Sequence, residues 1–125
     1  MKYFVSYARR DNSPEHLQEI SSFLGQTGRV YIDDLEIHDH GADRVRIVVD
    51  ALAEADVFIA VQSRNYLSTE WTKWELAKAL HDKIEVMALL PNWEFARWGT
   101  RQWPWPVNYV HARAISAPSM QPTLP

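Results

Sequence analysis

The chain has 125 residues, of which 46% are hydrophobic and 23% are charged, with a formal net charge of −3 at pH 7 and a pI near 5.9. This length is enough for one domain with a hydrophobic core and leaves no room for a second domain. The acidic net charge argues against a nucleic-acid partner, and the lack of cysteine excludes disulfides and thiolate chemistry. The apolar runs are too short to span a membrane. We therefore expect a cytoplasmic protein.

Five short runs rich in β-branched, apolar or aromatic residues predict strands. These runs cover residues 3–7, 29–32, 57–62, 85–90 and 109–115. Three intervening segments place apolar residues at helical spacing, at residues 14–24, 43–54 and 69–81. Strands that alternate with helices indicate right-handed crossovers between parallel strands, with helices on both faces of the sheet. The predicted fold is therefore α/β, a flavodoxin-like three-layer fold with a five-stranded parallel sheet.

The pattern becomes irregular after the fourth predicted strand. Residues 91–106 contain four tryptophans and several prolines, which predict loops and at most a short helix. Core packing is the favoured role for these tryptophans, and a partner-binding patch is the alternative. Residues 116–125 contain three prolines and no periodic pattern. We therefore expect a domain over residues 1–115, followed by a disordered or truncated C-terminal tail.

The segment from residue 63 to residue 76 is the most informative part of the chain. Ser68 and Thr69 are good N-cap residues for the helix that follows. Trp71 and Glu75 are four residues apart and share one face of that helix. The pattern predicts a carboxylate beside an indole near the carboxyl edge of a parallel sheet, where such folds bind ligands. The alternative is an ordinary surface glutamate paired with a nearby lysine.

Other chemistries lack the motifs that they need. The four glycines form no phosphate-binding loop, and the third predicted strand does not end in the aspartate of a response regulator. Residues 38–40, His-Asp-His, suit a metal, but their spacing matches no known ligand pattern, and no metal is predicted. Arg9 and Arg10 suit either a diphosphate or ordinary surface salt bridges. No Gly-x-Ser-x-Gly elbow supports a nucleophile among Ser6, Ser63 and Ser68.

Over residues 1–115 the chain resembles the Toll/interleukin-1 receptor (TIR) domain family. Three stretches support the resemblance, in the order of the family: the first box at residues 4–11 (Phe-Val-Ser-Tyr-Ala-Arg-Arg-Asp), the second strand and BB loop at residues 30–44, and the Trp-x-x-x-Glu region at residues 55–76. Any one of these matches alone is weak. Together they are specific.

The resemblance implies one of two functions. Some TIR domains are non-catalytic scaffolds that assemble through the BB loop, and others are enzymes that split NAD+ between nicotinamide and ribose by means of the Trp-x-x-x-Glu glutamate. Glu75 stands at that position and favours the enzyme. The expected substrate is NAD+, with no cofactor, and the expected products are nicotinamide with ADP-ribose or a cyclic ADP-ribose. We also expect self-association through TIR–TIR contacts, a role in antiphage defence, and a separately encoded effector or sensor as partner.

The resemblance also implies a set of site residues. Glu75 is the expected catalytic residue, because an anion beside the ribose stabilises the positive charge that develops as nicotinamide leaves. Trp71 is expected to exclude water and to raise the pKa of Glu75 by desolvation. The expected substrate-binding residues are Tyr7, Arg9, Asp33, Trp71 and Trp74, and the expected assembly residues are Asp39, His40 and Gly41. A nucleoside deoxyribosyltransferase-like enzyme, which also sets a glutamate against a ribosyl centre, is a further alternative.

Overall fold

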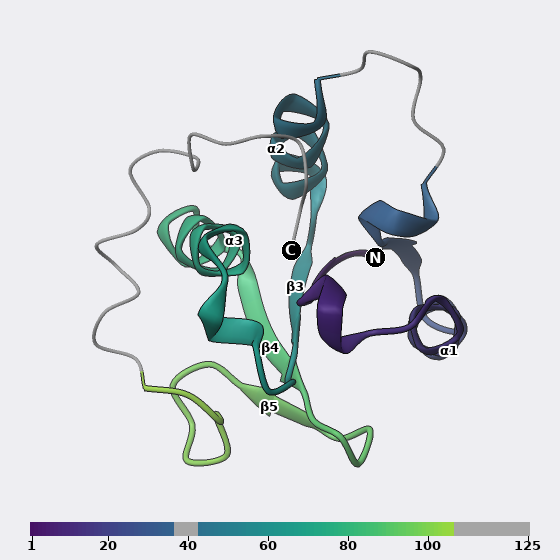
Figure 1. The fold of residues 1–125 in the computed structure, drawn as a ribbon. Coiled ribbons are helices and arrows are strands. Elements are labelled where there is room, and N and C mark those ends of the chain that lie inside the picture. The colour runs from purple at the N-terminus through teal and green to yellow at the C-terminus, as the bar shows by residue number, and fades with distance from the viewer. Residues whose placement is uncertain (37–42, 107–125) are drawn as a thin grey trace.

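The structure, a computed structural model, describes residues 1–36 and 43–106 (Figure 1). These residues form a five-stranded sheet in the order β2-β1-β3-β4-β5. The strands are β1 (Lys2–Ser6), β2 (Arg29–Tyr31), β3 (Val57–Val61), β4 (Glu85–Leu89) and β5 (Phe95–Arg97). The first four strands are parallel, and β5 pairs with β4 in the antiparallel direction.

Three α-helices and three short 3₁₀ helices connect the strands in the described part of the chain. They are η1 (Arg9–Asp11), α1 (Pro14–Gly25), η2 (Asp33–Leu35), α2 (Arg44–Glu54), η3 (Tyr66–Ser68) and α3 (Glu70–His81). Each α-helix begins at a side-chain cap, because Ser13, Asp43 and Thr69 each accept a hydrogen bond from the backbone N–H three residues later.

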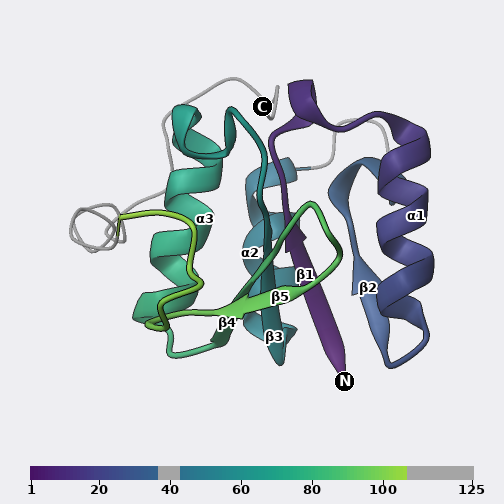
Figure 2. The ribbon, with the colours of Figure 1, turned by 90° about the horizontal axis from the view of Figure 1, so that it is seen from below.

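Neighbouring residues of the central strands face opposite sides of the sheet. Phe4 and Phe58 pack with α2 and α3, whereas Val5 and Ile59 pack with α1. Figure 2 shows the same division, with α1 apart from the other two helices. The result is a three-layer α/β fold in which α2 and α3 cover one face of the sheet together.

The predicted α/β, flavodoxin-like fold with a five-stranded sheet is confirmed, and four strands and three helices lie where the sequence predicts them. The prediction of loops and at most a short helix over residues 91–106 is wrong, because this segment contains β5. The backbone N–H of Trp93 bonds to Leu90 O and reverses the chain, so that β5 returns along β4 and makes the sheet mostly rather than wholly parallel. The predicted strand at 109–115 and tail at 116–125 lie outside the described residues.

The tryptophans of residues 91–106 differ in their surroundings. Trp103 is buried, and Trp98 and Trp105 pack against the same core as α3. Trp93 is 37% exposed and has a φ of +68°, a conformation that bulky residues seldom adopt. It packs edge-on against Phe23 of α1. Core packing therefore describes three of the four tryptophans.

Candidate functional site

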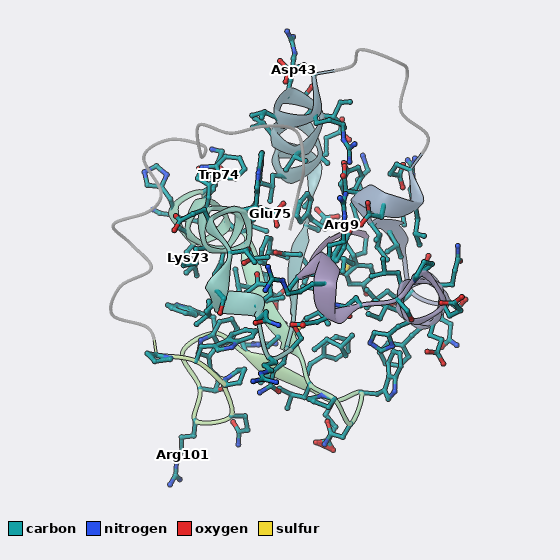
Figure 3. All side chains as sticks on the ribbon, in the orientation of Figure 1. Arg9, Asp43, Lys73, Trp74, Glu75 and Arg101 are labelled. Carbon is teal, nitrogen blue, oxygen red and sulfur yellow. The ribbon has the colours of Figure 1, made fainter. Side chains whose placement is uncertain are left out.

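Glu75 lies in the second turn of α3, at the carboxyl edge of the sheet. Its side chain is only 7% exposed, and Ser6 Oγ, at the end of β1, donates a hydrogen bond of 2.7 Å to its Oε1. Figure 3 shows Glu75 on the side of α3 that faces the middle of the molecule, whereas Lys73 leaves the helix on another side. The neighbouring lysines pair elsewhere, Lys73 with Glu70 and Lys78 with Asp82. The surface ion-pair alternative for Glu75 is therefore wrong.

A second hydroxyl extends this contact. Tyr66 Oη lies 2.8 Å from Ser6 Oγ, so that Tyr66, Ser6 and Glu75 form one chain of hydrogen bonds. The Tyr66 side chain is fully buried, and its ring stacks on Trp105 at a centroid distance of 4.6 Å. Three elements that are distant in sequence, β1, η3 and α3, are thereby joined by buried polar groups.

A small cavity adjoins the Glu75 carboxylate. It is lined by Phe4, Val5, Tyr7, Asp33, Trp71, Thr72 and Glu75, and its volume of about 10 Å³ suffices for little more than one water. Trp71 lines it as predicted, whereas Trp74 does not and instead packs edge-on against Trp71 at 5.4 Å. A dinucleotide would enter only after the lining side chains move apart.

Asp33 introduces a second carboxylate into the same cavity. It lies at the start of η2, accepts a hydrogen bond of 2.7 Å from Tyr31 Oη, and forms an ion pair with Arg44 at the start of α2. The charges of Asp33 and Arg44 thus neutralise each other where η2 meets α2. Their pairing leaves Glu75 without a cationic partner among the described residues.

The surroundings of Glu75 disfavour its charged form. Burial, opposed in part by the hydrogen bond from Ser6 and reinforced by the negative charge of Asp33, raises the pKa of Glu75 to about 8. A buried carboxyl group with a strongly raised pKa in a cavity is a candidate for a functional residue. The sequence also predicts a raised pKa for Glu75, through desolvation by Trp71. In the structure the main cause is the burial of Glu75 as a whole.

Tyr7 and Arg9 meet at Asp34 beside the cavity. Tyr7 Oη donates a 2.6 Å hydrogen bond to Asp34 Oδ2, and Arg9 donates two bonds of 2.7 and 3.0 Å to the Asp34 carboxylate. Although partial burial alone would raise the pKa of Asp34, the bonds from Arg9 and Tyr7 lower it. The guanidinium that was predicted to bind substrate is therefore paired within the protein.

The sequence model of the TIR domain family matches residues 4–109, which include Ser6, Asp33, Tyr66 and Glu75. The chain belongs to the TIR domain family. No curated protein and no solved structure gives a significant match to it. The TIR family includes NAD+-cleaving enzymes and non-catalytic members, and its domains commonly self-associate through TIR–TIR contacts.

Several predictions for this TIR domain concern the BB loop. Asp39, His40 and Gly41, the expected assembly residues, lie outside the described residues, as does the His-Asp-His segment. Elsewhere, in residues 1–36 and 43–106, no group of three or more His, Asp or Glu side chains is placed to hold a metal ion. None of the helices in these ranges is long and apolar enough to cross a membrane.

Sequence reasoning missed three groups of the TIR site. Ser6 was considered only as a nucleophile, although its spacing from Phe4 places both on the sheet face that α3 covers. Tyr66 and Arg44 were not singled out. The signal for Tyr66 is its place in the loop that leads from β3 into α3, whereas the Arg44–Asp33 pair depends on how η2 approaches α2 and has no local sequence signal.

Proposed function

We propose that this TIR domain is an NAD+ glycohydrolase or ADP-ribosyl cyclase that breaks the bond between nicotinamide and ribose, with Glu75 as its catalytic residue. The observation that supports this most is the buried Glu75 carboxylate, with its raised pKa, beside a cavity at the carboxyl edge of the sheet. Burying an ionisable group without a charged partner costs stability, because ionisation in a low dielectric is unfavourable, and such groups are found mainly at functional sites.

The positive charge of the substrate explains how a carboxyl group with a pKa near 8 acts at neutral pH. The nicotinamide ring of NAD+ is cationic, and a cation within a few ångströms favours the ionised form of a carboxyl group. Binding would therefore convert Glu75 to its anion at the position where positive charge moves onto the ribose. The C1′–N bond breaks with its electron pair going to nicotinamide, and the anion stabilises the oxocarbenium-like centre that remains.

The acceptor determines the product. If water adds to C1′ and releases a proton, the product is ADP-ribose. If a hydroxyl or ring nitrogen of the same dinucleotide adds to C1′, the product is a cyclic ADP-ribose. The second buried carboxylate, Asp33, is paired with Arg44 and Tyr31, which leaves it poorly suited to serve as the base for water. Both products therefore stay within the proposal.

We propose further that activity requires a rearrangement on self-association. The cavity beside Glu75, about 10 Å³, is too small for a dinucleotide. Arg9 is held by Asp34 in the same state. Contacts between subunits that separate these groups would open the cavity and free the guanidinium for the substrate diphosphate.

The test is NAD+ turnover by the purified chain at high concentration with a crowding agent, with products separated by chromatography and mass. Glu75→Gln should lower nicotinamide release by roughly 10³-fold, since it removes the anion. Glu70→Gln is the matched control on the same helix, because Glu70 is exposed and pairs with Lys73 outside the cavity. Equal turnover by wild type and Glu75→Gln would contradict the proposal.

The closed cavity also favours a second function, a non-catalytic scaffold that binds other TIR domains. This function predicts no nicotinamide release by wild type even when light scattering shows assembly. It also predicts that Glu75→Gln leaves assembly intact, whereas changes at Asp39, His40 or Gly41 abolish it. Deoxynucleosides included in the turnover assay test the deoxyribosyltransferase alternative, which predicts base exchange and indifference to NAD+.

A further inference from the structure

Ser6 is a polar residue on an apolar strand face. Phe4, on the same face of β1, packs with Phe58 and the helices α2 and α3, and the residue opposite Ser6 in the sheet is Ala60. Ser6 is 1% exposed. An alanine would fill this position without any hydroxyl to satisfy, so the presence of serine calls for a role for the hydroxyl.

The hydroxyls of Ser6 and Tyr66 can satisfy each other and an ionised Glu75 in one way only. A carboxylate accepts and does not donate, so the Ser6 proton points to Glu75 Oε1 at 2.7 Å. Ser6 Oγ then accepts the proton of Tyr66 Oη at 2.8 Å. Each hydroxyl has one proton to give, and the chain from Tyr66 through Ser6 to Glu75 uses both.

We propose that Ser6 and Tyr66 are positioning residues that orient the Glu75 carboxylate and stabilise its ionised form for the reaction. The inference rests on the proposed function for its rate effects. The orientation follows from the fixed backbones of donor and acceptor, since β1 holds Ser6 and the helix α3 holds Glu75. The bond from Ser6 restricts the rotamers of the carboxylate, and the bond from Tyr66 restricts the Ser6 hydroxyl that makes it.

The Tyr66 end of the chain is held by two further contacts and by its place in a 3₁₀ helix. Its ring stacks on Trp105, its backbone lies in η3, and its carbonyl oxygen accepts a hydrogen bond from the Thr72 hydroxyl on α3. Thr72 is one turn before Glu75 on the same helix. The donor and the acceptor ends of the chain are therefore tied to each other through α3 as well as through the hydroxyls.

Every charged or titratable group that faces Glu75 enters the expected pH dependence. Burial and the carboxylate of Asp33 at η2 raise the pKa of Glu75, and the hydrogen bond from Ser6 lowers it. Arg44 of α2 neutralises Asp33, and Tyr31 of β2 also bonds to Asp33. Tyr7, which lines the same cavity, and Tyr31 and Tyr66 all have pKa values raised by burial, so the three phenols stay neutral in the range of interest. Ser6 is thus the group that opposes protonation directly.

The first test needs no activity. Carbon-13 NMR of glutamate carboxyl groups gives the titration midpoint of Glu75, and loss of one resonance in Glu75→Gln assigns it. Ser6→Ala should move the midpoint upward by about one pH unit, because a hydrogen bond to the charged form is lost. Tyr66→Phe, which keeps the ring, should move it upward by less, and Ser6→Thr, which keeps a hydroxyl, should return it towards the wild-type value.

Ser63→Ala is the matched control. Ser63 Oγ also donates to a carboxylate, Asp11, at 2.6 Å, but outside the cavity. The Ser63→Ala substitution should therefore leave the titration midpoint of Glu75 unchanged. A midpoint that stays at its wild-type value in both Ser6→Ala and Tyr66→Phe would overturn the inference. So would an equal displacement in Ser63→Ala, because the effect would then not depend on contact with Glu75.

The second test is the pH dependence of kcat/KM for NAD+, which reports groups of the free enzyme. In wild type, kcat/KM should rise with pH as Glu75 ionises. Ser6→Ala should move the midpoint of this rise to a pH about one unit higher. The variant's kcat/KM should therefore be about tenfold lower than wild type at pH 7, and much closer to wild type at a pH above both midpoints. A purely structural role predicts one uniform loss at every pH. If wild type releases no nicotinamide, the proposed function fails, and the NMR titration alone decides the positioning of Glu75.

Discussion

Two carboxylates at the carboxyl edge of the sheet each accept a hydrogen bond from a serine, yet their surroundings differ. Asp11, after β1, accepts bonds from Ser63 Oγ at 2.6 Å and from the backbone N and Nδ2 of Asn65, both at 2.7 Å. Glu75 accepts one bond from Ser6 within the described residues and is far more buried. Burial alone would raise the pKa of Asp11, but the bonds from Ser63 and Asn65 lower it.

The comparison separates a carboxyl group that is held in its ionised form from one whose protonated form is favoured. Asp11 ties η1 to the loop after β3, and its donors satisfy it in the ionised form. Glu75 has one hydrogen bond against strong desolvation, and its pKa rises to about 8. The number of hydrogen-bond donors relative to the burial, rather than the presence of a serine, determines which protonation state of each carboxyl group is favoured.

The largest expected effect is on how stability depends on pH, through Glu75. Its folded-state pKa of about 8 lies above the unfolded value, so the folded state binds the extra proton and its stabilisation is lost as pH rises from about 4.5 to 8. Wild type should lose a few kcal/mol of unfolding free energy across this interval. Glu75→Gln should lack that loss. Urea unfolding at pH 5 and pH 8.5 measures it.

Glu70→Gln, an exposed glutamate on the same helix, should keep the wild-type slope. Parallel pH profiles for wild type and Glu75→Gln would mean that Glu75 is ionised in the folded protein at neutral pH. The contrast with Asp11 would then disappear.

Asp11→Ala should give the next largest effect, with the opposite dependence on pH. It removes three hydrogen bonds and should cost about 3 kcal/mol at neutral pH. Because the pKa of Asp11 is lowered, this stabilisation is present above the unfolded value and is lost as pH falls through the folded value. Thermal unfolding at pH 7 and pH 3 measures the change. Asp50→Ala, which removes a surface carboxylate 4.0 Å from Arg46, should have almost no effect.

Ser63→Ala tests the same contrast between Asp11 and Glu75 with a smaller expected loss of stability. Asp11 keeps its two bonds from Asn65, so the loss should be about 1 kcal/mol. The kcat/KM profile should keep its wild-type midpoint. A shifted midpoint would show that the two carboxylates are coupled, and denaturant unfolding with pH-rate measurements on the same preparations decides this.

The smallest effect concerns Arg9, which pairs with Asp34 rather than with Glu75 or Asp11. If Arg9 must leave Asp34 to bind the substrate diphosphate, Asp34→Asn should lower the KM for NAD+ by roughly threefold, and Arg9→Ala should raise it by a similar factor. Arg10→Ala is the control, since Arg10 is exposed. A KM that is the same in all three variants would remove Arg9 from the binding site.

Periodicity and capping residues predicted four strands and three helices with small errors at their ends, because these elements are determined by local patterns. Thr69 caps α3 as its position suggests, and Trp71 and Glu75 share a face as their spacing requires. The strand β5 was not predicted, because it depends on the chain reversal at residues 90–94, where no glycine marks the turn and Trp93 adopts the positive φ instead.

The site was predictable in part. Glu75, Trp71, Tyr7 and Asp33, four of the predicted site residues, line one cavity, and their catalytic and binding roles stay predictions. Trp74 points into the core and Arg9 pairs with Asp34, because tertiary packing determines both. No local pattern links Ser6 with Glu75, since 69 positions separate them in sequence. Only the packing of α3 against β1 brings the two side chains together.

The described sheet ends on both sides in strands of three residues, β2 and β5. Short edge strands offer few free backbone groups to another chain, and the charged Arg29 and Arg97 on them further discourage strand addition. Concentrated preparations should therefore resist amyloid-like stacking. Reversible filaments of this domain, if they form, would be built from side-chain surfaces and would dissolve on dilution.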